Sequence, residues 1–230
     1  MTQENTRKRT VLITCIEKYM GMAIKEKFES LGLNVICDNS SMTSEAEANS
    51  LIKNAGNIDI LVANLAEPPM TGPVQNIENE DWNKLFDSLV HPLMYLVRAV
   101  TPQMLERKSG KIIAITSAAP LKGIANNAAY CAARGAQNGF IKAVGLELAR
   151  SNIQVNAILP GWHWTEMTKV MKDTPRDDEI RRKTPAGRWG TAEDLIGTAV
   201  FLSSSASDFV TGVSIPVDGG YSIAESLLYD

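Results

Sequence analysis

Short apolar runs alternate with longer, mixed stretches along almost the whole chain. The apolar runs occupy 10–14, 34–37, 59–63, 111–116, 153–159 and 213–217. Runs of this length predict strands of a parallel sheet, and those at 10–14, 59–63 and 111–116 are expected to be buried on both faces. The stretches between them that predict helices are 21–31, 44–55, 79–107, 128–150 and 191–203. Strands that alternate with helices predict a single α/β domain with helices on both faces of the sheet.

Three local features modify this pattern. Pro92 and Pro102 lie inside the predicted helix 79–107 and are expected to bend or break it. Asn126 and Asn127 precede an Ala-rich helix and are expected to cap it. The segment 160–185, rich in Trp and charge, predicts no regular element.

Composition excludes several classes of function. The chain has 230 residues, a net charge of −3 and a pI near 5.5, which offers no basic surplus for nucleic acid or an anionic membrane. Its length suits one domain, 1–230, with a polar N-terminal arm and a C-terminal tail. Neither a signal peptide nor an apolar run of membrane-spanning length is recognised. We therefore expect a cytoplasmic protein.

Cysteine and histidine are too few to suggest a metal site. The cysteines are Cys15, Cys37 and Cys131, an odd and widely spaced set that favours a reducing compartment. His91 and His163 add no metal-ligand spacing, so no metal is expected. Cys131 follows Tyr130 but points to a different helix face and is interpreted as a packing residue.

The candidate chemistry lies between Ser117 and Arg134. Ser117 follows the strand 111–116, and the carboxyl ends of strands are where open α/β sheets bind ligands. Tyr130 and Arg134 are four residues apart on the next helix and share a face. A permanent cation lowers the pKa of a neighbouring phenol by about 1–3 units, which makes it a usable base. Taken alone, the three residues also fit a surface Tyr–Arg pair beside a strand-end Ser.

Further motifs make the chain resemble the short-chain dehydrogenase/reductase family over nearly its whole length. They are Asp59-Ile-Leu-Val-Ala-Asn64, the Ser117/Tyr130 pair, Val155-Asn156-Ala157, Pro160-Gly161 and Val217-Asp218-Gly219-Gly220. The resemblance implies a Rossmann-like, doubly wound parallel sheet of about six or seven strands. It also implies association into a homotetramer through the helices 79–107 and 128–150, and we expect apolar residues of the tail to pack on a neighbouring subunit.

The chain departs from that family where the family binds its cofactor. The Gly-rich turn is here Thr14-Cys-Ile-Glu-Lys-Tyr-Met-Gly21, in which Cys15 and Tyr19 replace two glycines that let backbone approach a pyrophosphate. Arg134 replaces the family's Lys, and Leu89 replaces its helix Asn. The segment between Asp38 and Asp59 is also shorter than the corresponding segment of that family. These departures predict an enzyme without a nucleotide cofactor.

The departures resemble the halohydrin dehalogenases, a group derived from the same family. Their signatures are Thr-x4-Phe/Tyr-x-Gly, matched at Thr14, Tyr19 and Gly21, and Ser-x12-Tyr-x3-Arg, matched at Ser117, Tyr130 and Arg134. The resemblance implies a lyase that converts a vicinal halohydrin into an epoxide and halide, reversibly. Ser117 would bind the substrate oxygen, Tyr130 would be the base, and Arg134 would lower its pKa.

The same resemblance implies where the halide and the substrate would lie. The expected halide site comprises Tyr19, Pro160, Gly161, Trp162 and His163, and the expected substrate pocket comprises Leu65, Ala119 and Leu121. Trp162 and Trp164 also fit core positions, and His163 fits a loop residue better than a base. Two alternatives stay open: an NAD(P)-dependent short-chain reductase with a degenerate cofactor turn, and a catalytically silent scaffold.

Overall fold

The computed structural model describes residues 7–224, in which six parallel strands form one sheet. The strand order is β2-β1-β3-β4-β5-β6. The strands are β1 Thr10–Ile13, β2 Asn34–Cys37, β3 Ile60–Asn64, β4 Gly110–Ile115, β5 Ile153–Pro160 and β6 Ser214–Val217. Every residue of β1, β3, β4 and β5 is buried, whereas the edge strands β2 and β6 are only partly buried. The buried strands predicted at 10–14, 59–63 and 111–116 are confirmed. The predicted doubly wound α/β fold is confirmed.

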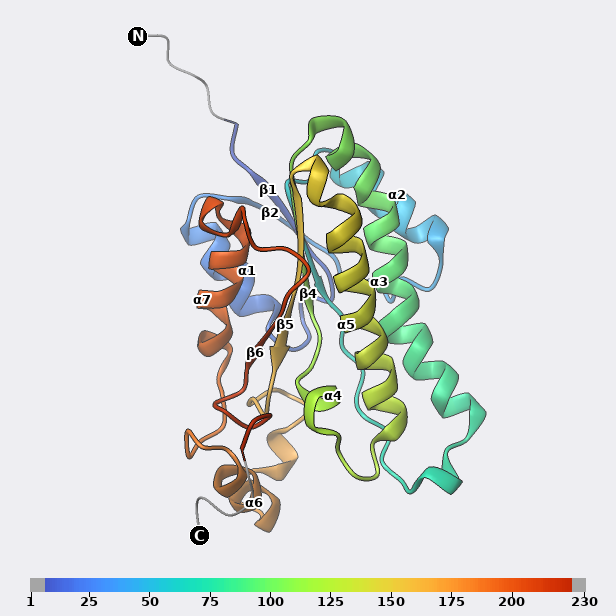
Figure 1. Ribbon diagram of the computed structural model, residues 1–230, viewed down its shortest axis with the longest axis vertical. Helices are drawn as coiled ribbons and strands as arrows, with labels where there is room; N and C mark the ends of the chain where they lie inside the picture. The colour runs from blue at the N-terminus through green and yellow to red at the C-terminus, as the bar shows by residue number, and fades with distance from the viewer. Residues whose placement is uncertain (1–6, 225–230) are drawn as a thin grey trace.

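Helices cover both faces of the sheet, as Figure 1 shows. The longer helices are α1 Gly21–Ser30, α2 Glu45–Ala55, α3 Asn79–Arg107, α5 Ala128–Leu148 and α7 Ala192–Ser203. Helices α1 and α7 pack together on one face, whereas α2, α3 and α5 pack on the other. Two apolar cores result, one on each face of the sheet. The short helices α4 Ala119–Lys122 and α6 Pro175–Lys183 lie at the lower end of Figure 1.

Of the two outcomes expected for Pro92 and Pro102, a bend or a break, the structure excludes the break. Helix α3 continues as one element from Asn79 to Arg107 with both Pro92 and Pro102 inside it. A proline removes one backbone hydrogen bond, but its ring still packs as an apolar side chain. Pro92 is buried with Leu89 and Leu93 in the core, and this burial offsets the lost bond.

Two further expectations need correction. The segment 160–185 is not irregular throughout, because α6 begins with Pro175 at its first turn, has acidic residues there and has basic residues in its last turn. Asn127 is the N-cap residue of α5, but its side chain donates to the carbonyl of Ala125 and does not cap the helix. Asn126 instead adopts a left-handed backbone conformation with φ 62°.

Some expectations fall outside the residues that the structure describes. These are the polar arm before residue 7 and most of the C-terminal tail, including Leu227, Leu228 and Tyr229. Within residues 7–224, no helix is both long and apolar enough to cross a membrane.

Candidate active site

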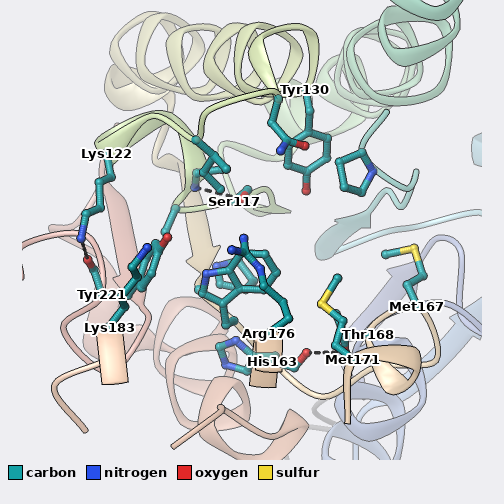
Figure 2. A pocket seen from close by; sticks show the side chains of 18 of the residues that line it. Ser117, Lys122, Tyr130, His163, Met167, Thr168, Met171, Arg176, Lys183 and Tyr221 are labelled. Atoms are coloured by element: carbon teal, nitrogen blue, oxygen red, sulfur yellow. Dashed lines mark hydrogen bonds between the residues drawn. The ribbon is translucent and has the colours of Figure 1, made fainter. Parts of the chain in front are cut away.

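One large cavity opens at the carboxyl ends of the strands, where β4 and β5 end and α4 and α6 lie. Its volume is about 1040 Å³, and Ser117, Tyr130 and Tyr19 line it together. Figure 2 shows the side chains of Ser117 and Tyr130 on the same wall of this cavity. Ser117 follows β4, and its Oγ accepts a hydrogen bond from the backbone N–H of Ala119 at 3.1 Å. The hydroxyl is therefore held at the start of α4.

Arg134 is completely buried behind the phenol of Tyr130. Its Nε donates to the Tyr130 hydroxyl at 3.1 Å. The remaining guanidinium nitrogens donate to the carbonyls of Ile115 and Leu65 and to Oε1 of Gln137. None of these partners carries a negative charge. A buried cation with neutral partners is costly, and ionisation of Tyr130 would provide its counterion.

The electrostatic environment makes Tyr130 easier to ionise. Burial by itself raises the pKa of a phenol. The charge of Arg134 opposes this effect, with further help from hydrogen bonds to Tyr19, Arg134 and Ser117, and the pKa of Tyr130 falls below its ordinary value. A phenolate at this position can take a proton from a substrate hydroxyl, and the phenol can return it.

Tyr19 also contacts the hydroxyl of Tyr130. It lies in the turn between β1 and α1, and its hydroxyl is 3.4 Å from that of Tyr130. The guanidinium carbon of Arg134 lies 5.9 Å from the centre of the Tyr19 ring. Burial, followed by the neighbouring Tyr130, raises the pKa of Tyr19. Tyr130 is therefore the member of the pair that ionises first.

The turn between β1 and α1 retains Gly21 and has two other residues in conformations that glycine favours. Cys15 and Tyr19 adopt left-handed conformations with φ 47° and 54°, which glycine adopts readily and other residues rarely. The side chain of Asn64 holds the turn by donating to the carbonyls of Cys15 and Lys18 at 3.0 and 2.9 Å. The backbone course has been retained, while a phenol has been added to the space that it borders.

A nicotinamide dinucleotide, implied by the family resemblance, would meet two side chains here that differ from those of the family's site. The hydroxyl of Tyr19 lies 3.4 Å from that of Tyr130, and Tyr19 lines the cavity beside it. Arg134, in place of the family's Lys, already directs its donors to Tyr130 and to protein carbonyl groups.

Residues 160–163, which were expected to form part of a halide site, line the cavity. Pro160 ends β5, and Gly161 packs so closely on Asp218 that an added Cβ would lie 2.5 Å from its side chain. Trp162 lies in the cavity wall with its edge toward Trp189, at 5.7 Å between ring centres.

His163 lies deeper in the same wall and is only 4% exposed. Neither ring nitrogen has a hydrogen-bond partner among residues 7–224. Burial lowers the pKa of His163, so the imidazole is neutral at pH 7.

The expected substrate pocket is only partly reproduced. Ala119 lines the cavity, but Leu65 is buried in the core and contributes its carbonyl oxygen to Arg134. Leu121 is half exposed and borders a separate, smaller depression. Trp164 does not line the cavity either, because it stacks on Trp189 at 4.1 Å. Apolar residues near a motif in sequence thus need not face its cavity.

Sequence reasoning missed a group of charged side chains that line the cavity. They are Lys122 from α4 and Arg176, Glu179, Arg182 and Lys183 from α6. The one available signal was the start of a helix at Pro175 with acidic residues next to it. No cluster of three or more metal-ligating side chains occurs within the described part of the chain.

The chain is similar to several proteins that are named reductases or dehydrogenases. A family model described as "Enoyl-(Acyl carrier protein) reductase" matches residues 7–222. The "5-keto-D-gluconate 5-reductase" of Escherichia coli (strain K12) is 38% identical over 204 residues, which are 86% of this chain and 80% of that protein. The structure of a gluconate 5-dehydrogenase from Burkholderia cenocepacia J2315, in complex with NADP and tartrate, is 30% identical with a TM-score of 0.85, covering 94% and 96% of the two chains.

These names contradict the expectation of a halohydrin dehalogenase. Curated relatives are called gluconate 5-dehydrogenase or 2-dehydro-3-deoxy-D-gluconate 5-dehydrogenase, which are oxidoreductases and not lyases. A structure described as "Dehalogenation enzyme" is also 30% identical, with a TM-score of 0.86 and coverage of 94% and 98%, so similarity of fold does not separate the activities. The prediction depended on Tyr19 and Arg134, two local substitutions in a shared scaffold. The expected cofactor independence also conflicts with these names.

Proposed function

Because the chain belongs to the short-chain dehydrogenase/reductase family, we propose that it interconverts the hydroxyl and keto forms of a small sugar acid. The names of the curated relatives support this substrate class. The observation that carries the chemistry is the buried Arg134 beside Tyr130, which lowers the pKa of the phenol in a cavity that Ser117 also lines.

The protein residues supply the proton-transfer half of this reaction. In oxidation, Ser117 binds the substrate hydroxyl and the Tyr130 phenolate takes its proton. In reduction, the Tyr130 phenol returns a proton to the oxygen of the former keto group. Arg134 stabilises the phenolate in both directions, since its charge is permanent and fully buried. Hydride transfer is the chemistry that a nicotinamide would supply in this family.

Assembly and location are proposed on weaker grounds. A homotetramer through α3 and α5 is the association expected from the family, and Leu146 on α5 is 80% exposed in the single chain. Light scattering at micromolar concentration tests this proposal, and a monomer would contradict it. Cys15, Cys37 and Cys131 are all free thiols, which supports the cytoplasm as the proposed compartment.

The test is a substrate assay with the purified chain. D-gluconate with NAD or NADP, or a keto-gluconate with the reduced cofactor, should give a substrate-dependent change in absorbance of the reduced nicotinamide. The matched control is the Tyr130→Phe variant, which should show no change. The proposal is wrong if no sugar acid and nicotinamide give a rate above this control, or if the chain releases halide from a chlorohydrin in the absence of any nicotinamide.

A further inference from the structure

The cavity has two chemically different ends. Ser117 and Tyr130 lie on one wall, whereas α6 contributes Arg176 and Lys183 to another part of the lining. Figure 2 shows Arg176, Lys183 and Lys122 around the same cavity as Tyr130, with Lys122 and Lys183 away from the phenol. These cations do not belong to the proton-transfer site, and the proposed reaction gives them no role.

The lining of the cavity is positive although the protein is negative. Four cations line it, Lys122, Arg176, Arg182 and Lys183, against one carboxylate, Glu179, which gives a net charge of +3. The whole chain has a net charge of −3. His163 does not alter this balance, because burial lowers its pKa and keeps it neutral at pH 7. A concave surface with one sign of charge concentrates small ions of the opposite sign.

The one carboxylate does not satisfy the cations. Glu179 accepts a hydrogen bond from Arg176 at 2.6 Å and another from Lys183 at 2.6 Å, so two cations share one negative charge. Hydrogen bonds from Lys183 and then Arg176 lower the pKa of Glu179, which therefore stays ionised. Arg182 has no ion pair within residues 7–224. A second carboxylate would lower the net charge of the lining from +3 to +2.

Arg176 is oriented for such a contact. Its guanidinium carbon lies 5.5 Å from the centre of the Trp162 ring, a cation–π distance, and Trp162 is itself part of the cavity wall. The ring and Glu179 together restrict the side chain, and a restricted guanidinium binds a carboxylate at a smaller cost in conformational entropy. Lys183 provides a second donor on the next turns of the same helix.

We infer that Arg176, assisted by Lys183, binds the carboxylate of the substrate while Ser117 and Tyr130 act on a hydroxyl or keto group at its other end. This inference rests on the proposed function and assigns the residues that select an acid over a neutral polyol. In a gluconate that reacts at carbon 5, the carboxylate and the reacting carbon are near opposite ends of the molecule. Such a substrate matches a cavity with a cationic end and a separate proton-transfer end.

The experiment compares the charged substrate with its neutral analogue. Arg176→Gln should lower kcat/KM for D-gluconate by about tenfold or more, mainly through KM, because it removes a charge-assisted hydrogen bond. The same variant should change kcat/KM for D-sorbitol, which lacks the carboxylate, by less than about twofold. Lys172→Gln is the matched control, since it removes an exposed cation near α6 that does not line the cavity. An equal loss for both substrates, or no loss for gluconate, would overturn the inference.

A binding measurement separates this inference from the proposed reaction. Thermal unfolding is followed with D-gluconate or D-sorbitol and no nucleotide, since a ligand that binds only the folded state raises the melting temperature. Gluconate should stabilise the wild type and the Lys172→Gln variant, and Arg176→Gln should lose this effect. Such a result without any oxidoreduction would retain the carboxylate site and reject the proposed function. Oxidoreduction of gluconate with no effect of Arg176→Gln would retain the proposed function and reject the carboxylate site.

Discussion

The hydroxyl of Tyr19 lies 3.4 Å from the hydroxyl of Tyr130, although the two residues are far apart in sequence. The contact joins the first turn of the fold to the proton-transfer site. Tyr130 has a lowered pKa and Tyr19 a raised one, so Tyr19 donates to the Tyr130 phenolate once it forms. The same contact places the side chain of Tyr19 in the lining of the cavity beside Tyr130. Tyr19 therefore affects both the base and access to it.

Replacement of Tyr19 by glycine should open the site to a dinucleotide. Its φ of 54° suits glycine, so the turn can keep its course without the side chain. We expect the Kd for NADPH, measured by its fluorescence, to fall at least about tenfold in Tyr19→Gly. Tyr19→Phe is the control, because it keeps the ring and should bind NADPH as the wild type does. Equally tight binding to wild type and Tyr19→Gly would show that Tyr19 does not block the site.

Tyr130→Phe should abolish activity without unfolding the protein. The substitution removes the hydroxyl that exchanges the proton but keeps the ring, which is only 7% exposed and packs in the core. We expect kcat to fall by about 10²–10⁴, the usual contribution of a positioned acid or base. Circular dichroism and the melting temperature check that the fold survives. A variant that retains near wild-type kcat would exclude Tyr130 as the proton-transfer residue.

The lowered pKa of Tyr130 should be visible in its absorbance. The phenolate band near neutral to alkaline pH should show one tyrosine that ionises below the ordinary value of about 10, and this component should be missing from Tyr130→Phe. Arg134→Lys should change the pKa of Tyr130 seen in this titration, because a buried Lys can lose its proton whereas Arg cannot.

The same titration affects stability with a definite sign. Between the folded pKa of Tyr130 and about 10, the unfolded state binds more protons, so this group makes stability rise with pH. Denaturant unfolding at several pH values should show that rise in the wild type relative to Tyr130→Phe. A pH dependence that is identical in the two proteins would contradict the lowered pKa.

His163 should make the protein sensitive to acid. Burial lowers its pKa below the ordinary value of about 6.5, and the unfolded state therefore binds a proton first as the pH falls. The free energy of unfolding should decrease as the pH falls below about 6.5, until the folded pKa is passed. In urea unfolding, the His163→Gln variant should not show this component of the decrease in the free energy of unfolding. The exposed His91→Gln is the matched control and should retain it; loss of the component in that variant instead would contradict the assignment.

Gly21 should be essential for the first turn, whereas Gly197 should not. A Cβ on Gly21 would lie 2.3 Å from the backbone oxygen of Ile16, and backbone cannot move aside cheaply. We expect Gly21→Ala to destabilise the protein by about 1–3 kcal/mol in urea unfolding. Gly197 lies in α7 with open space around it, so Gly197→Ala should stabilise by about 0.5–1 kcal/mol. Equal effects of the two substitutions would contradict this close packing.

The sequence by itself determined the architecture and the pairing of Tyr130 with Arg134. Mainly apolar runs identify buried parallel strands because both faces of such strands are covered, and this holds for β1, β3 and β4. Tyr130 and Arg134 could be paired because helical spacing is a local property of the chain. The sequence also located the unusual turn at Tyr19, but the activity inferred from that turn was wrong.

Only the tertiary structure decided which distant residues share the cavity. Leu65 and Leu121 were both expected in the substrate pocket. Leu65 faces the core and Leu121 faces solvent, since the direction of a side chain depends on how its element packs. Helix α6 buries only Asp177 and Ile180, too little for a hydrophobic period that sequence can reveal. Its cations reach the cavity because the fold closes that end of the sheet with α6. Charge at a site is a sum over elements far apart in the chain, and folding brings those elements together.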